Sequence, residues 1–147
     1  MTNVEFFNIL PARLMPFMQA NEPQLMAAVM MGEAEGETDI GKAAVLGVIM
    51  NRVRTRHMGC ETVHQVALKR HQFSCFWADY ELRRQVMLDA ILSPPVILAR
   101  IINQVLDGYD PSCGALYYFN PQVVLPSWAG TMRQTARIGQ HMFMAPR

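Results

Sequence analysis

The sequence has little of several features that mark common protein classes. It has 3 cysteines in 147 residues, too few and odd in number for the disulfide framework of a small secreted protein. Its 13 basic and 12 acidic residues leave a net charge of +1, without the basic excess of a dedicated nucleic-acid binder. No apolar run reaches the roughly 18 residues of a membrane-spanning helix, so we expect no stable membrane insertion.

The short motifs of several enzyme classes are also missing. There is no glycine-rich phosphate loop, no Gly-x-Ser-x-Gly elbow and no His-Glu-x-x-His pair. His57, Cys60, His64, His71 and Cys75 lie near one another in sequence, but their spacing fits no compact zinc site. We therefore expect no metal and no cofactor. Cys75 and His71 remain open as a cysteine nucleophile with its base.

The residues that are present describe a globular protein. Hydrophobic residues make up 51% of the chain and charged residues 17%, which is not the composition of a disordered protein. A length of 147 residues favours a single domain with its own core, spanning residues 1–147. Mostly helical patterns followed by a few short strands predict a mostly α fold of the α+β class.

Capping residues and apolar runs predict where the elements lie. Asn21 is a good N-cap for a buried helix over about 22–34, and Thr38 begins a second buried helix that runs to about residue 53. Residues 122–137 are expected to be irregular or briefly helical. The other predicted elements are a short helix within 1–20, helices at 61–68, 80–92 and 95–106, and strands at 116–119 and 141–144.

Three carboxylates stand where the first buried helix is expected to end, in the hexapeptide 32–37. Glu33 lies nearest the apolar run that precedes them. Apolar surroundings make a carboxylate costly to ionise, and a general acid must hold its proton near neutral pH. Glu33 is therefore the candidate acid, although solvated glutamates at a helix end remain the alternative on spacing alone. Gly36 is expected to end the helix.

Aromatic and amide side chains elsewhere suit a carbohydrate ligand. Sugars have flat C–H faces that stack on aromatic rings, and hydroxyl groups that form hydrogen bonds with amides and phenols. Taken singly, each such residue could equally belong to the core or to a turn. The residues with this character are Asn51, Gln72, Trp77, Tyr117, Tyr118, Asn120 and Trp128.

Several short segments, among them 33–37, 51–53, 72–75 and 114–121, carry characteristic residues in a characteristic order. In these segments the chain resembles the cell wall hydrolase family, which includes the spore cortex-lytic enzymes. The combination is specific, whereas the Glu-Ala-x-Gly-Glu pattern alone is not. Met31-Gly32 and Gly41-Lys42 depart from the Tyr-Ala and Gly-Gln common in that family. The matching segments, which cover about residues 25–143, are 33–37, 44–45, 51–53, 72–75, 110–111, 114–121, 128, 137–139, 141 and 143.

This resemblance implies a lysozyme-like fold and cleavage of bacterial peptidoglycan between N-acetylmuramic acid and N-acetylglucosamine. Family members are often lytic transglycosylases, in which one glutamate protonates the glycosidic oxygen and then accepts the proton of the muramyl 6-hydroxyl. By position in the motif, Glu33 is the acid and base, Glu37 is a supporting catalytic carboxylate, and Glu35 faces solvent. A hydrolysing muramidase, a non-catalytic glycan-binding module and a Cys-His amidase are the alternatives.

The resemblance and the side-chain chemistry together nominate residues that bind the substrate or position the catalytic carboxylate. Trp128 is expected to stack on a sugar, and His141 to support the cleft. The full set is Gln72, Phe73, Tyr117, Tyr118, Asn120, Trp128 and His141.

The N-terminal segment does not resemble a secretory signal, because Glu5 replaces a basic region and prolines interrupt the apolar residues. We expect a monomer that is made in a host cytoplasm without a signal peptide. A leaderless catalytic domain of this kind resembles a bacteriophage endolysin, which reaches the wall and lyses the host after holins open the membrane. A virion-associated lysin is the alternative setting.

Overall fold

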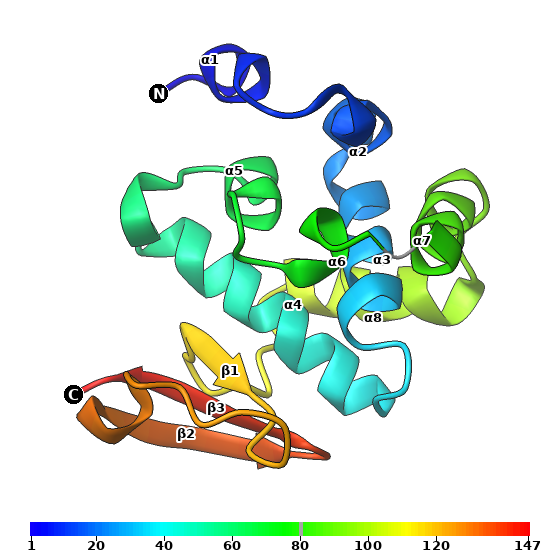
Figure 1. Ribbon diagram of the computed structural model, residues 1–147. Coiled ribbons are helices and arrows are strands. Elements are labelled where there is room, and N and C mark those ends of the chain that lie inside the picture. Colours follow the sequence, from blue (N-terminus) through cyan, green and yellow to red (C-terminus); the bar gives the residue numbers. More distant parts are fainter. Residues whose placement is uncertain (80) are drawn as a thin grey trace.

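A body of helices lies above a small antiparallel sheet that is formed by the C-terminal part of the chain (Figure 1). The computed structural model describes residues 1–79 and 81–147. The predicted mostly α fold of the α+β class is confirmed. The helical segments are α1 (Asn3–Asn8), η1 (Ala12–Leu14), α2 (Met15–Gln19), α3 (Glu22–Glu33), α4 (Asp39–Arg54), η2 (His57–Gly59), α5 (Val63–Leu68), α6 (Ser74–Trp77), α7 (Glu81–Leu92), α8 (Val96–Leu106) and η3 (Ala129–Thr131).

The two predicted buried helices, α3 and α4, form the centre of the body. The Asn21 side chain accepts the N–H of Gln24 at 2.9 Å, and Gln24 Oε1 accepts the N–H of Asn21 at 2.9 Å. This reciprocal capping box satisfies two backbone donors at the start of α3. Thr38 caps α4 by accepting the N–H of Gly41 at 3.1 Å. Both helix starts therefore agree with the prediction.

The apolar run of α3 is fully buried, with residues 25–30 all at 0% exposure. It packs against α7, α8, α5 and α6 as well as α4, so nearly every side of the helix meets another element. The helix ends at Glu33, with Ala34 as its C-cap. Gly36 therefore lies in the turn after the helix, and Glu33 and Glu37 do not share a helical face.

The sheet consists of three strands in the order β1-β3-β2, both pairs antiparallel. The prediction that residues 122–137 are irregular or briefly helical is wrong for residues 132–137, which belong to β2. Its partner is β3, and a register shift between Gln134 and Ala136 breaks the regular alternation that identifies a strand in sequence. The strands are β1 (Tyr117–Phe119), β2 (Met132–Ile138) and β3 (His141–Pro146).

A buried polar network joins the sheet to α4. Asp110 Oδ2 accepts the amide N–H of Asn51 at 2.8 Å and the backbone N–H of Gly114 at 2.9 Å. Asp110 Oδ1 accepts the backbone N–H of Ser112 at 2.9 Å and its hydroxyl at 2.5 Å. A Cβ at Gly47 would collide with this carboxylate, so only glycine allows α4 to pass so close. The network fixes the turn that leads into β1.

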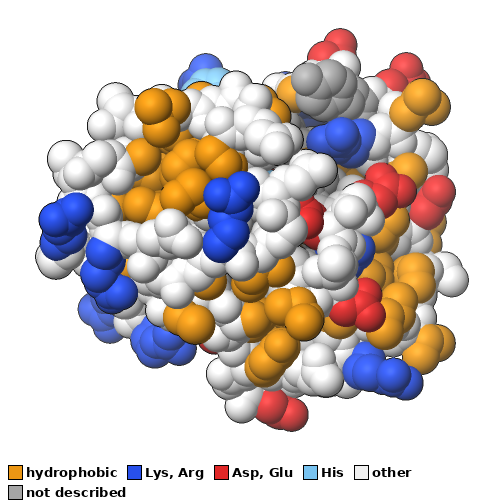
Figure 2. Space-filling view, turned by 90° about the horizontal axis from the view of Figure 1, so that it is seen from below, with side chains coloured by type: hydrophobic (Ala, Val, Ile, Leu, Met, Phe, Trp, Pro, Cys, Tyr) orange, Lys and Arg blue, Asp and Glu red, His pale blue; other side chains and the backbone are white. Residues whose placement is uncertain are grey.

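Charge is unevenly distributed over the face under the sheet. In Figure 2, Lys and Arg side chains gather mainly at one end of this face and most acidic side chains lie towards the other. Arg133, Arg137 and Arg147 are exposed residues of the last part of the chain, which contains no acidic residue after Asp110.

Within residues 1–79 and 81–147, no single helix is both long and apolar enough to cross a membrane. The α7 and α8 helices pass that test only as a pair, and they are bent by 76° relative to each other.

Candidate active site

Glu33 is the last residue of α3, and its carboxylate lies where α3, α6 and β1 meet. Its Oε1 accepts the backbone N–H of Cys75 at 3.0 Å and lies 3.5 Å from the hydroxyl oxygen of Ser74. Its Oε2 accepts the phenol of Tyr118 at 3.2 Å. The Glu33 residue is half-buried. Donors from two distant segments therefore orient the carboxylate while it remains open to solvent on one side.

The neighbours of Glu33 are held in their protonated forms. Burial, and then the adjacent Glu33 carboxylate, raise the pKa of the Tyr118 phenol well above its ordinary value. The same two causes raise the pKa of the Cys75 thiol. At neutral pH the phenol therefore keeps the proton that it donates to Glu33.

The Cys-His alternative does not assemble. Cys75 is only 4% exposed, and its raised pKa disfavours the nucleophilic thiolate. His71 instead contacts the ring of Trp77, with 5.6 Å between the ring centroids, and accepts the Nε–H of Arg70 at 3.2 Å. Within the part of the chain that the structure describes, no hydrogen bond joins His71 to Cys75.

Glu37 lies in a different environment from Glu33. Its Oε1 is 3.2 Å from Nδ1 of His141, and both side chains are largely buried, at 11% and 14% exposure. This approach is not an aligned hydrogen bond, because Nδ1 of His141 has no partner in hydrogen-bond geometry among the described residues. Gly139, in the turn between β2 and β3, has a φ of 55°, and a Cβ there would collide with Oε2 of Glu37. The β2–β3 hairpin therefore encloses the Glu37 carboxylate.

His141 links this second carboxylate to the first. Its ring meets the Tyr118 ring edge-on, with 5.1 Å between the centroids. Burial lowers the pKa of His141, while Glu37 and Glu33 act in the opposite direction. The expectation that His141 supports the site agrees with this position between Glu37 and Tyr118.

Gln72 and Phe73 lie on the segment that leads into α6. Gln72 is half-buried, and its Oε1 accepts Nη1–H of Arg52 at 3.4 Å. Phe73 is only 1% exposed, and its ring lies 6.5 Å from the ring of Tyr118. Phe73, nominated as a substrate-binding or positioning residue, is therefore too buried to contact a sugar and instead packs beside Tyr118.

Tyr117 and Trp128 form an aromatic cluster beside β1. Their ring centroids are 5.0 Å apart, and Trp128 also meets Phe119 edge-on at 5.5 Å. Both Tyr117 and Trp128 are half-buried, which leaves part of each ring for a sugar. The amide of Asn120 is used locally, because its Oδ1 accepts the N–H of Gln122 at 2.9 Å and its Nδ2 donates to Gln140 at 3.2 Å.

Two residues with carbohydrate-like chemistry do not join this cluster. Asn51 is 2% exposed, and its amide donates to Asp110 and to the carbonyl of Ala115 at 3.0 Å, so it has a structural role. Trp77 contacts His71 and lies under the guanidinium of Arg13, at 5.8 Å from the ring centroid.

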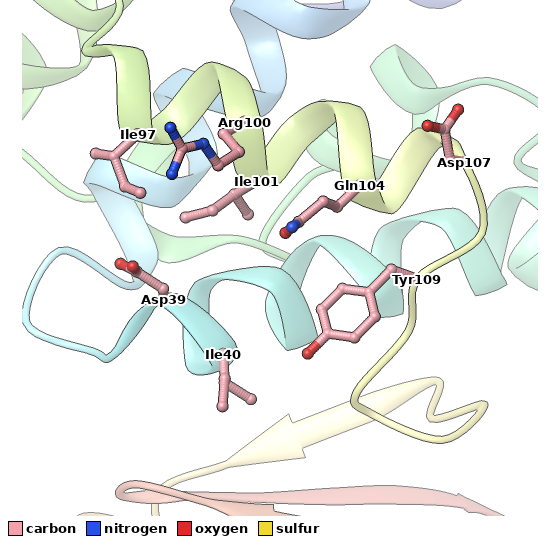
Figure 3. Close-up of a pocket in the computed structure, with 8 residues that line it drawn as sticks. All are labelled: Asp39, Ile40, Ile97, Arg100, Ile101, Gln104, Asp107 and Tyr109. Carbon is pink, nitrogen blue, oxygen red and sulfur yellow. The ribbon is translucent and has the colours of Figure 1, made fainter.

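A large hollow in the surface lies elsewhere, between α8 and the start of α4 (Figure 3). It has a volume of about 680 Å³ and is lined by apolar residues such as Ile40 and Ile97 together with Asp39, Arg100 and Gln104. None of the residues that orient Glu33 lines it. We place the candidate site at Glu33 because several donors converge on its carboxylate and orient it for a reaction. The hollow shows only that a ligand would have room there.

No group of three or more His, Cys, Asp or Glu side chains suited to hold a metal ion occurs among residues 1–79 and 81–147.

Sequence reasoning missed three contributors to the site. The backbone N–H of Cys75 has no sequence signal, because every residue other than proline carries one. Ser74 falls within the matching segment 72–75, but the sequence alone assigns it no role. Arg52 belongs to the matching segment 51–53 without an assigned role, and its place just after the apolar run of α4 is the signal that could have found it.

Known proteins resemble this chain over most of its length. A family model described as Cell Wall Hydrolase matches residues 36–144, so the match begins three residues after Glu33. The spore cortex-lytic enzyme of Bacillus cereus is 34% identical over 123 residues, which are 84% of this chain and 44% of that enzyme. The spore cortex-lytic enzyme of Halalkalibacterium halodurans is 35% identical over 123 residues, which are 84% of this chain and 34% of that enzyme. The chain thus spans less than half the length of these curated relatives.

Two solved structures are similar in fold and sequence. The catalytic domain of the Bacillus cereus SleB protein superposes with a TM-score of 0.68 at 32% identity, covering 84% of this chain and 88% of that domain. The catalytic domain of the germination-specific lytic transglycosylase SleB from Bacillus anthracis gives a TM-score of 0.68 at 29% identity, covering 92% of this chain and all of that domain. With the family match over most of its length, the chain belongs to the cell wall hydrolase family.

Proposed function

We propose that this protein degrades bacterial peptidoglycan by cleaving the glycan strand between N-acetylmuramic acid and N-acetylglucosamine, as a lytic transglycosylase. The observation that carries the proposal is the unequal state of two glutamates. Glu33 is oriented by donors and open on one side, whereas Glu37 is enclosed by the β2–β3 hairpin. One available carboxylate is what this reaction needs. The lytic transglycosylase named among the similar structures supports the same class.

In the proposed reaction, protonated Glu33 donates its proton to the glycosidic oxygen as the bond from that oxygen to C1 of the muramyl residue breaks. The Glu33 carboxylate then accepts the proton of the muramyl 6-hydroxyl while O6 bonds to C1. The products are a free 4-hydroxyl on N-acetylglucosamine and a 1,6-anhydromuramyl end. No water is consumed, and Glu33 returns to its protonated state with the proton of the 6-hydroxyl.

The donors around Glu33 have distinct parts in this cycle. The N–H of Cys75 and the phenol of Tyr118 hold opposite oxygens of the carboxylate, so its plane is fixed. Both donors stabilise the anion that forms when Glu33 gives up its proton. The Ser74 hydroxyl, at 3.5 Å, can turn towards Oε1 or towards a ligand.

A hydrolysing muramidase is the second candidate. That mechanism needs a second carboxylate that activates water or forms a covalent intermediate. Glu37 is close to Glu33 in sequence and is largely buried beside the site. Its carboxylate, however, faces His141 and Gly139. This arrangement favours a supporting role for Glu37, as the motif implies. A non-catalytic glycan-binding module would not need donors that orient the Glu33 carboxylate.

The biological setting remains a prediction. We propose a bacteriophage endolysin that causes host lysis with the help of holins, whereas the curated relatives are named spore cortex-lytic enzymes. Comparing release of fragments from vegetative sacculi and from spore cortex separates the two settings, because an endolysin must act on the former.

The proposal is tested by the Glu33→Gln variant on purified sacculi. We expect turbidity loss to stop while the melting temperature stays within about 2 °C of the parent, because the amide conserves the size of the side chain. The matched control is Glu35→Gln, which changes an exposed glutamate of the same loop and should clear sacculi at the parental rate. An active, folded Glu33→Gln protein would refute the assignment.

A further inference from the structure

Arg52 is a buried cation at the edge of the candidate site. Only 7% of the residue is exposed. Its Nε donates to the carbonyl of Leu116 at 2.7 Å, and its Nη1 donates to Oε1 of Gln72 at 3.4 Å. Its guanidinium lies between two rings, 5.6 Å from the centroid of Phe73 and 5.4 Å from that of Tyr117. Arg52, a residue of α4, therefore contacts both β1 and the segment before α6.

No carboxylate lies within 4.0 Å of this guanidinium among residues 1–79 and 81–147. Burial lowers the pKa of Arg52, but an arginine remains charged near neutral pH. Its charge is balanced by a carbonyl, an amide oxygen and two ring faces instead of an acid. Burying a cation is costly, and a methionine or leucine would fill the same space. The contacts of the guanidinium itself therefore need an explanation.

The contact with Gln72 has a consequence for the orientation of the amide. A guanidinium has only donors, so the Gln72 atom that faces it must be the carbonyl oxygen. The amide NH₂ of Gln72 must then point away from Arg52. We propose that Arg52 is a positioning residue that orients Gln72 so that its NH₂ group donates a hydrogen bond to an acetamido carbonyl of the glycan strand.

The choice of ligand group rests on the proposed function and on simple complementarity. Both sugars of the glycan strand carry an N-acetyl group, whose carbonyl oxygen only accepts hydrogen bonds. A fixed NH₂ group only donates, so the two match without any need for either to rotate. Sugar hydroxyls both donate and accept, and a pure donor does not distinguish them. Arg52 thereby makes Gln72 selective for N-acetylated sugars.

The position of Gln72 suits this role. It is two residues before Ser74, whose hydroxyl oxygen lies 3.5 Å from the Glu33 carboxylate. Two residues of chain span at most about 7 Å, so Gln72 lies near enough to Glu33 for one bound glycan strand to contact both. Tyr117, which packs against Arg52, contacts Trp128 and extends the same wall. The buried Arg52 guanidinium therefore contacts both Gln72 and Tyr117, a polar and an aromatic residue that we expect to bind the sugar.

Two substitutions at position 72 test separately whether the Gln72 amide must be present and whether its NH₂ group must face the ligand. In Gln72→Glu, one carboxylate oxygen keeps the bond from Arg52, but the other presents an acceptor where the NH₂ group was. Gln72→Ala removes both contacts. On soluble glycan fragments we expect KM to rise about tenfold for Gln72→Ala and about a further tenfold for Gln72→Glu, with kcat within about threefold of the parent.

The matched control is Gln104→Glu, the same change at an exposed glutamine on α8, in the hollow of Figure 3. It should leave KM unchanged. Arg52→Lys, which keeps the charge but cannot span both contacts, should raise KM about as much as Gln72→Ala does.

A second arm uses glycan fragments from which the N-acetyl groups have been removed. If Gln72 donates to the acetamido carbonyl, the KM difference between the parent and Gln72→Ala should shrink from about tenfold to less than twofold. An undiminished difference would assign the Gln72 contact to a hydroxyl and overturn the proposal. Equal KM values for the parent and Gln72→Glu on the acetylated substrate would overturn it as well.

These outcomes are separate from failure of the proposed function. If the protein does not cleave glycan strands, the parent releases no fragments from either substrate. If only the present inference fails, the parent cleaves the acetylated substrate and the position-72 variants match it. Thermal unfolding of each variant shows whether a change in KM comes from a loss of folded protein.

Discussion

Two carboxylates in this protein accept several hydrogen bonds, yet their surroundings differ. Asp110 accepts bonds from Asn51, Ser112 and Gly114, all at 2.5 to 2.9 Å, and these bonds lower its pKa against the opposing effect of burial. Glu33 has longer contacts, at 3.0 to 3.5 Å, and is open on one side. Asp110 joins α4 to the turn before β1, whereas Glu33 is oriented by longer contacts and remains half-exposed.

The difference shows why one carboxylate stabilises the fold while another is available for a reaction. A carboxylate whose oxygens are fully used by short bonds resists protonation and cannot reach a ligand. One that is oriented by a few donors keeps a free lone pair for a substrate. Glu37 lies between these extremes, because the β2–β3 hairpin encloses it and it faces a histidine of lowered pKa.

The largest expected effect breaks the network at Asp110. In Asp110→Asn, the new NH₂ group must face donors such as the N–H of Ser112 or Gly114, which leaves buried donors unsatisfied. We expect the free energy of unfolding to fall by about 3 kcal/mol in urea denaturation. Glu33→Gln should change it by less than about 0.5 kcal/mol. Equal destabilisation by both substitutions would remove the distinction between the two carboxylates.

A somewhat smaller effect is expected where the hairpin encloses Glu37. In Gly139→Ala, the new Cβ meets the Glu37 carboxylate at a backbone φ of 55°, so both crowding and backbone strain oppose folding. Thermal unfolding should show a loss of about 2 kcal/mol, together with reduced activity. Gly130→Ala is the control, since nothing lies within 4 Å of its Cβ position. If Gly139→Ala behaves like this control, Glu37 is not enclosed.

Removal of one donor from Glu33 should have a moderate effect on catalysis. Tyr118→Phe keeps the ring contacts with His141 and deletes the hydrogen bond to Oε2. We expect kcat to fall about tenfold, as for the loss of one hydrogen bond to a charged group, with little change in KM. A rise in KM at constant kcat would instead place Tyr118 in direct contact with the substrate.

The smallest effect concerns pH. Burial lowers the pKa of His141 in the folded protein, so between that pKa and the unfolded value near 6.5 the unfolded chain binds more protons. Stability should therefore decrease as the pH falls below about 6.5, by less than about 1 kcal/mol. His141→Gln should flatten this slope in melting temperatures measured from pH 7.5 to 5.5. His57 has a pKa lowered in the same direction, so His57→Gln is the necessary comparison.

Much of the fold could be predicted because local signals coincide with tertiary structure. Asn21 and Thr38 mark the starts of α3 and α4 through side-chain caps, which depend only on nearby residues. The strand β2 was missed because its extended shape comes from pairing with β3 across a register shift. Residues 80–92 were predicted as a helix, and α7 confirms this from Glu81, while position 80 lies outside the described residues.

The site was predictable in part. Glu33 and Tyr118 were identified through the family resemblance, and Glu35 is exposed as expected. The sequence could not show that Asn51 is bound by Asp110, because the two are 59 residues apart and meet only through the fold. The amide orientation of Gln72 likewise follows from Arg52, which lies 20 residues earlier, on α4.

The measurement that tests the central claim most directly is mass spectrometry of the fragments released from purified peptidoglycan. If Glu33 works as a single acid and base, the muramyl ends carry a 1,6-anhydro ring and are lighter by one water than reducing ends. The Glu33→Gln variant should release neither product. Fragments that end in reducing muramic acid would contradict this account, because they require a second group that activates water.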